Sequence, residues 1–134
     1  MEDRAEFPAV AGLPTVLVVD DEPEVVLVLQ FSLEAEGYQT WSASNGVEAL
    51  EEIAAHHPQL MVLDIMMPTM DGWSVLEEML KLPAEERPRV VVVSALASLQ
   101  DRAKAVELGA DAYVPKPFNV EELIGVLHDL VPVS

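Results

Sequence analysis

Apolar residues gather in short runs along this chain, and each run gives way to polar residues. Strands are predicted at 15–19, 60–63 and 90–93, where branched apolar side chains follow one another without a break. Runs of this kind are typical of strands buried on both faces of a parallel sheet. Two weaker strands are predicted at 39–43, where alternation indicates a half-exposed strand near the sheet edge, and at 111–114.

The segments between the strands carry apolar residues at helical spacing, bordered by Gly, Pro or Asn. Helices are predicted from Pro23 to before Gly37, from Gly46 to about Ala55, after Gly72 to Leu80, after Ala95 to Leu108, and from the cap Asn119 to before Pro132. The second helix is expected to turn one face inward, made of Val47, Leu50, Ile53 and Ala54. Residues 81–88 are expected to form a loop.

The strand–helix alternation, repeated five times, predicts an α/β fold with a doubly wound parallel sheet. We expect five strands in the flavodoxin-like order 2-1-3-4-5, flanked by five helices. This domain is expected to span residues 14–134. Residues 1–13 have no usable period and are expected to form a flexible leader.

Composition limits the classes of function. The 134 residues are 51% hydrophobic and 23% charged, with no cysteine and a net charge of −17. Phosphate contacts need a basic surface, so direct binding of nucleic acid is not expected. No signal peptide and no run of the ~20 apolar residues that span a bilayer are found in the sequence. A cytoplasmic protein without a membrane partner is the simplest expectation.

Polar side chains follow the ends of four predicted strands. Asp20 and Asp21 follow the first strand, Asp64 the third, Ser94 the fourth, and Lys116 comes soon after the fifth. The order 2-1-3-4-5 puts the first and third strands side by side, so the carboxylates are expected to meet at the switch point. Carboxylates this close repel unless a cation holds them, and such a sparse oxygen set suits Mg²⁺. A metal, an amine and a hydroxyl around one carboxylate are what phosphoryl transfer to it requires.

Four segments carry a resemblance to a known family. They are Val18-Val19-Asp20-Asp21-Glu22, the run from Asp64 to Gly72 (Asp-Ile-Met-Met-Pro-Thr-Met-Asp-Gly), Ser94-Ala95, and the run from Gly109 to Phe118. In this order they resemble the receiver domain of response regulators in two-component signal transduction. The resemblance covers residues 15 to about 131.

The resemblance implies a role for each acidic residue. Asp64 matches the residue that accepts phosphorus from the phosphohistidine of a sensor histidine kinase or phosphotransfer protein. Asp21 matches a direct ligand of Mg²⁺, and Asp20 a ligand that acts mostly through water. The backbone carbonyl of Met66 matches the third protein ligand.

The resemblance also implies a switch. Ser94 matches the hydroxyl that turns toward the phosphoryl group, Tyr113 the switch aromatic, and Lys116 the salt-bridging amine, whose bond to Pro117 is often cis. We expect the face of the fourth helix, fifth strand and fifth helix to change shape for an unidentified downstream partner or output domain. Arg102 and Lys104 are expected on that face.

Two alternatives stay open. The chain could be a protein-interaction domain that keeps the fold without phosphorylation. Less favoured is an aspartyl-phosphate phosphatase of the haloacid-dehalogenase type, which needs a second acid two residues after the nucleophile, where this chain has Met66. We therefore expect a signalling domain rather than an enzyme that turns over outside substrates. Met66 and Leu96 are expected to shield the phosphoryl group from water and to slow its loss.

Overall fold

The chain folds around one five-stranded parallel sheet in the order β2-β1-β3-β4-β5, as predicted. The computed structural model describes residues 12–96 and 98–133. The strands are β1 (Thr15–Val19), β2 (Gln39–Ala43), β3 (Leu60–Asp64), β4 (Arg89–Ser94) and β5 (Ala112–Pro115). The helices are α1 (Pro23–Ala35), α2 (Gly46–His56), α3 (Gly72–Met79), α4 (Leu99–Glu107) and α5 (Val120–Leu130).

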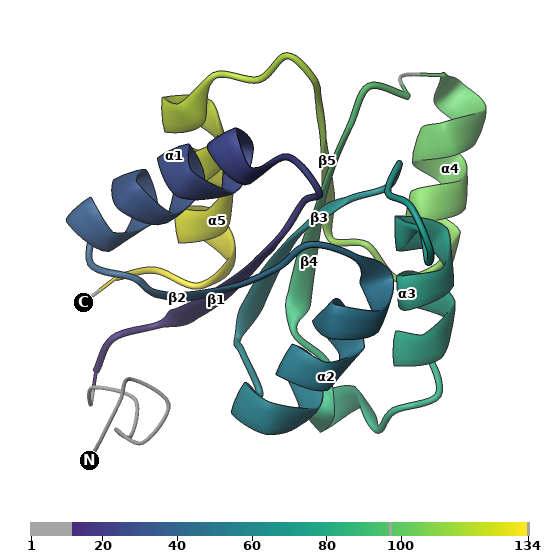
Figure 1. Cartoon of the computed structure of the whole chain (residues 1–134), viewed down its shortest axis with the longest axis horizontal. Coiled ribbons are helices and arrows are strands. Elements are labelled where there is room, and N and C mark those ends of the chain that lie inside the picture. The colour runs from purple at the N-terminus through teal and green to yellow at the C-terminus, as the bar shows by residue number, and fades with distance from the viewer. Residues whose placement is uncertain (1–11, 97, 134) are drawn as a thin grey trace.

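Helices cover both faces of the sheet (Figure 1). α1 and α5 pack on one face, and α2, α3 and α4 on the other. Neighbouring residues of a strand point to opposite faces, so Val16 and Val18 of β1 join the α1–α5 core, while Leu17 and Val19 join the other. This explains why the central strands are unbroken apolar runs: each side chain has a helix layer to pack against.

Side-chain caps fix where most of the helices begin. The side chains of Asn45, Asp71, Ser98 and Asn119 each accept a hydrogen bond from the backbone N–H three residues on. The predicted cap Asn119 is therefore confirmed. α1 begins instead with Pro23 in its first turn, where a missing N–H costs nothing.

Three local expectations need correction. β2 lies at the sheet edge, but Gln39, Thr40 and Ala43 are buried, because helices cover both of its faces. In α2 the buried residues are Gly46, Ala49 and Ile53, and Leu50 also packs against the core, so the prediction is confirmed for Leu50 and Ile53. It is wrong for Ala54, which is exposed. Val47 is instead 45% exposed, and its neighbour Gly46 turns inward, where its backbone N–H donates to the carbonyl of Met70. The predicted loop 81–88 contains a short 3-10 helix, Ala84–Glu86.

The predicted leader at 1–13 lies almost wholly outside the described residues, which begin at Gly12. Within the described part of the chain, no helix combines the length and apolar character needed to cross a bilayer.

Candidate functional site

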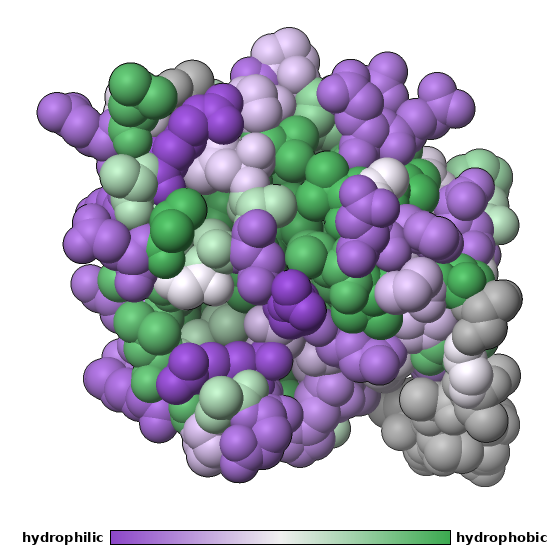
Figure 2. Space-filling model, turned by 180° about the vertical axis from the view of Figure 1, so that it is seen from behind, coloured by the Kyte–Doolittle hydropathy of each residue, from purple (hydrophilic) through white to green (hydrophobic). Residues whose placement is uncertain are grey.

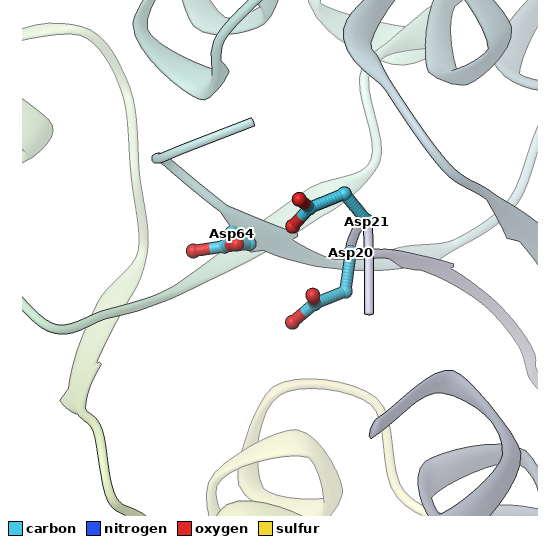
Figure 3. Close-up of side chains that lie close together, drawn as sticks. All are labelled: Asp20, Asp21 and Asp64. Carbon is cyan, nitrogen blue, oxygen red and sulfur yellow. The ribbon is translucent and has the colours of Figure 1, made fainter. Parts of the chain in front are cut away.

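Three aspartates meet at the carboxyl edge of the sheet. Asp20 follows β1, Asp21 comes next, and Asp64 ends β3; a carboxylate oxygen from each lies within 4.8 Å of the others. The strand register explains this meeting, since Val19 pairs with Leu63 and the next residue of each strand is an aspartate. The three side chains project to the same side of the strand ends (Figure 3). The predicted switch-point cluster is therefore present.

Lys116 is the cation in this cluster. Its Nζ lies 3.0 Å from Oδ2 of Asp20, 3.6 Å from Oδ2 of Asp64 and 3.4 Å from Oε1 of Glu22. The backbone N–H of Lys116 donates to the carbonyl of Ser94 (2.8 Å), which fixes the lysine beside the end of β4. The Lys116–Pro117 bond is cis, as the resemblance implied.

Glu22 is a site residue to which the sequence reasoning gave no role. Its carboxylate pairs with Lys116, and its backbone N–H donates to Oδ1 of Asp20 (2.9 Å). The signal was present, because Glu22 continues the Asp-Asp pair after β1. A third acid at a helix start is also explained by the helix dipole alone, so the sequence could not single it out.

The environment favours the neutral form of Asp64. Burial and the negative charge of Asp20 raise its pKa from 3.8 to about 6, while Lys116 and a hydrogen bond from the backbone N–H of Met66 act in the opposite direction. The pKa of Lys116 is raised: its burial lowers the value, but the bond to Asp20 and the charge of Asp64 outweigh that effect. The cluster therefore holds more negative charge than its lysine balances.

A shallow pocket of about 380 Å³ opens over the cluster. It is lined by Asp21, Glu22, Asp64, Met66, Ala95 and Lys116. Met66 is 59% exposed, whereas its neighbour Met67 is only 9% exposed and packs in the core. The pocket lining therefore combines carboxylates, an ammonium and a thioether, and the pocket is open to solvent.

The loop from β3 to α3 is held by close backbone contacts. Gly72 donates its N–H to the carbonyl of Ile65 (2.8 Å), and a Cβ on Gly72 would lie 2.6 Å from the carbonyl oxygen of Asp64. Gly46 likewise donates to the carbonyl of Met70 (3.1 Å). Two glycines, one at each helix start, therefore let this loop close tightly behind Asp64.

Ser94 and Tyr113 are both bonded to one residue, Leu96. The Ser94 hydroxyl, fully buried at the end of β4, accepts the N–H of Leu96 (3.1 Å). The Tyr113 hydroxyl donates to the carbonyl of Leu96, and the ring packs against the α2–α3–α4 core. The backbone of Leu96 therefore links the two residues predicted to form the switch.

The basic residues of α4 point in two directions. The Arg102 guanidinium lies 5.0 Å from the centre of the Tyr113 ring, on the expected side of the helix. The Lys104 ammonium lies 4.4 Å from the Trp73 ring and so faces α3. The expectation that both lie on the α4–β5–α5 face is therefore wrong for Lys104.

Comparison with known proteins gives one family. Residues 16–128 match the family described as "Response regulator receiver domain". A "Probable transcriptional regulator ycf27" of Porphyridium aerugineum is 42% identical over 108 residues, 81% of this chain and 44% of that protein. A "Response regulator MprA" of Mycobacterium ulcerans is 41% identical over 116 residues, 87% of this chain and 49% of that protein. The chain spans about half the length of these curated relatives.

Solved structures agree in fold. A CheY-like response regulator receiver domain protein from Methanospirillum hungatei superposes with a TM-score of 0.81 and 32% identity, covering 87% of this chain and 92% of that one. The receiver domain of the Francisella response regulator 1452 gives a TM-score of 0.81 and 34% identity, covering 87% and 95%. Both likenesses extend over nearly the whole described chain.

Proposed function

This chain belongs to the response regulator receiver family and is a signalling domain of two-component systems. From that membership, we propose that Asp64 is its phosphoacceptor. The donor is a histidine kinase or a phosphotransfer protein. The observation that supports the proposal is the cluster of Asp20, Asp21 and Asp64 with Lys116, beside a pocket that Asp21, Asp64 and Lys116 line. Each group has a distinct use in moving a phosphoryl group onto a carboxylate.

Asp64 is suited to be the nucleophile. An oxygen of its carboxylate forms a bond to phosphorus as the bond from phosphorus to the donor's imidazole nitrogen breaks, and the electron pair leaves with the imidazole. A pKa of about 6 leaves most of the carboxylate ionised above pH 7. Lys116, already within 3.6 Å of Oδ2, can then move its ion pair onto a phosphoryl oxygen.

The acidic cluster fits a divalent cation. Receiver domains generally bind Mg²⁺, and three carboxylate oxygens within 4.8 Å of one another form a donor set for a hard ion. We assign Asp20, Asp21, Asp64 and the backbone carbonyl of Met66 to hold it. When bound, the ion neutralises charge on the phosphoryl oxygens.

The donor is expected to dock on α1. Leu27 and Phe31, one turn apart on this helix, are 69% and 77% exposed, and Leu27 also borders a cleft shared with Asp20 and Asp21. Exposed apolar side chains of this size at the margin of a functional cleft are typical of a protein contact. A Phe31→Ser variant should slow phosphorylation by a protein donor and leave phosphorylation by acetyl phosphate unchanged. Equal slowing with both donors would contradict the docking role.

The partner that reads the signal is expected on the α4–β5–α5 face. Leu99 and Val106 of α4 are 84% and 67% exposed, and β5 is the sheet strand with the most accessible residues. The view from behind the molecule shows apolar side chains running between hydrophilic margins (Figure 2). Arg102 and Tyr113 lie at this face. Because Ser94 and Tyr113 are both hydrogen-bonded to Leu96, a movement of Ser94 can change the position of Tyr113. The partner is a separate protein or an output domain.

Labelling with acetyl phosphate tests the proposal. The protein is incubated with the reagent and Mg²⁺, and intact mass and peptide mapping locate the added phosphoryl group. We expect it on Asp64, with no labelling of Asp64→Asn and none after chelation of the metal. A protein that binds its partner equally well without any labelling would favour the phosphorylation-independent interaction domain. Steady hydrolysis of small phosphoesters would favour the phosphatase.

A further inference from the structure

Met66 differs from the other methionines that the structure describes. It is 59% exposed, whereas Met61, Met67 and Met79 are between 0% and 9% exposed and Met70 is partly buried against the core. The sequence has no cysteine, so methionine is its only sulfur-containing residue. Among the described methionines, oxidation should therefore concentrate at this residue, because access decides which methionine reacts.

The position of Met66 gives such an oxidation a consequence. Its side chain lines the same pocket as Asp64 and Lys116. Its backbone N–H also donates a hydrogen bond to the Asp64 carboxylate, so the residue stays beside the acceptor. A change in the polarity of this side chain would therefore change the polarity of the pocket in which phosphorylated Asp64 would lie.

We propose that Met66 is an oxidation site through which peroxides shorten the lifetime of phosphorylated Asp64. This inference rests on the proposed function, since it concerns the same pocket. In the step, the Met66 sulfur gives an electron pair to one oxygen of hydrogen peroxide. An S–O bond forms, the O–O bond breaks, and after proton transfer the products are methionine sulfoxide and water. The sulfur is oxidised and the peroxide oxygen is reduced.

The chemistry of the two forms sets the direction of the effect. A thioether is a poor hydrogen-bond acceptor and presents apolar surface, so it does not order water near phosphorus. A sulfoxide is polar, and its oxygen can accept a hydrogen bond from water and orient that water toward the phosphoryl group. One hydrogen bond to the attacking water changes a rate by about fivefold. We expect the loss of phosphate to accelerate by about that factor.

The first measurement maps oxidation in the full chain. The protein is treated with dilute hydrogen peroxide, and peptide mass spectrometry follows the gain of one oxygen atom at each methionine. We expect Met66 to react first among the described methionines. Equal reaction at the buried Met61 or Met79 would overturn the proposal, because access would then not select the residue.

The second measurement compares phosphoryl lifetimes before and after peroxide, using protein labelled with acetyl phosphate. Wild type and Met70→Leu should both lose phosphate about fivefold faster after oxidation, whereas Met66→Leu should show the same lifetime with and without peroxide. The Met66→Leu protein keeps Met1, so any effect of oxidation there would remain visible. Met66→Gln, which puts a polar acceptor at this position, should shorten the lifetime without peroxide.

The outcomes separate the two proposals. If untreated protein takes no phosphoryl group on Asp64, the proposed function fails and the oxidation proposal fails with it. If Asp64 is labelled and Met66 is fully oxidised, but the lifetime stays the same, only the oxidation proposal is overturned. Reversal by a methionine sulfoxide reductase should restore the original lifetime in the same sample.

Discussion

Polar groups are paired at the amino edge of the sheet, where the strands begin, but are clustered at the carboxyl edge, where the strands end. At the amino edge, Thr15 and Gln59 exchange hydrogen bonds: the backbone N–H of each donates to the other's side chain. Arg89 pairs there with Asp111, which also accepts the N–H of Val90. At the carboxyl edge, Asp20, Glu22 and Asp64 share one lysine, and the Asp21 carboxylate lies in the same cluster.

This difference supports the proposal that the carboxyl edge binds a ligand, whereas the paired groups of the amino edge stabilise the fold. Matched pairs at the amino edge leave little to gain from any ligand, because each group already has its partner. Clustered carboxylates destabilise the fold unless something outside the chain neutralises them. The carboxyl edge therefore keeps a cost in stability that a cation can relieve. The predictions below test this contrast by changing one edge at a time.

The largest effect is expected from Lys116→Met. This substitution removes the only ammonium within reach of Asp64 among the described residues and leaves a side chain of similar length. Removing one preorganised group that stabilises developing charge costs about 100-fold in rate. The rate of Asp64 phosphorylation by acetyl phosphate with Mg²⁺ should fall by about that factor, measured by intact mass against time.

A matched control for this change is Lys81→Met. Lys81 is an exposed lysine whose ammonium forms an ion pair with Glu78 on the protein surface. Its loss should leave the phosphorylation rate within twofold, because exposed pairs contribute little. A comparable loss of rate in both variants would mean that overall charge, and not the position of Lys116, controls the reaction.

The next effect in size is a gain in stability from Asp64→Asn. In metal-free buffer at pH 7.5, Asn should raise the free energy of unfolding by about 2 kcal/mol, measured by urea denaturation; this is less than the roughly 3 kcal/mol of the full pKa shift because solvent in the open pocket screens the charge. The reason is that wild type must keep a carboxylate ionised at a site that favours its neutral form. Asn keeps nearly the same shape and removes the charge.

The pH dependence gives the sign of this effect. Asp64 has a folded pKa of about 6 and an ordinary value of 3.8, so between these values the folded state binds the proton more tightly than the unfolded state. The contribution of Asp64 to wild-type stability should therefore fall as pH rises from about 4 to 6, and the advantage of Asn should grow across the same window. A constant difference from pH 4 to 7.5 would contradict this cause. Added Mg²⁺ should narrow the gap at pH 7.5.

The same contrast explains how much could be predicted from the sequence. The strand order was predictable from the strand–helix alternation, which is typical of a doubly wound parallel sheet. The acids at strand ends were predictable because buried strands need apolar runs, and the first polar residue marks the end of each run. Asp20 and Asp64 follow such runs directly. The parallel register then brings the two together with no further information.

What escaped prediction depends on side-chain direction. The turn of Lys104 toward Trp73 and the pairing of Glu22 with Lys116 are set by helix rotation and by loop paths. Hydrophobic periodicity is too coarse to fix these rotations, as the inward face of α2 also shows. The pair Arg89–Asp111 was missed for a different reason: its partners lie 22 residues apart, so no local sequence pattern indicates it.

A smaller loss is expected from Gly72→Ala. The added Cβ would lie 2.6 Å from the carbonyl oxygen of Asp64 and 2.7 Å from Cα of Ile65, so backbone must move. Overpacking of this kind costs about 1 to 2 kcal/mol, and urea denaturation should show it. Gly125→Ala is the matched control: its Cβ meets nothing within 4 Å in α5, and Ala should stabilise the helix by about 0.5 to 1 kcal/mol. Loss of stability in both variants would argue against the close contact as the cause.

The smallest effect is expected from Asp111→Asn at the amino edge. The substitution is the same as at Asp64, but here it should lower the free energy of unfolding. The substitution removes the charge that pairs with Arg89 at 3.1 Å, while the remaining amide oxygen can still accept the N–H of Val90. Because this pair is partly exposed, the free energy of unfolding should fall by only about 0.5 to 1 kcal/mol, and by less in high salt. Urea denaturation of both variants in one buffer measures the contrast. If Asn stabilised the protein at both edges, the net charge of −17 would explain the gain in stability at Asp64. The local arrangement of charges at the two edges would then not be the cause.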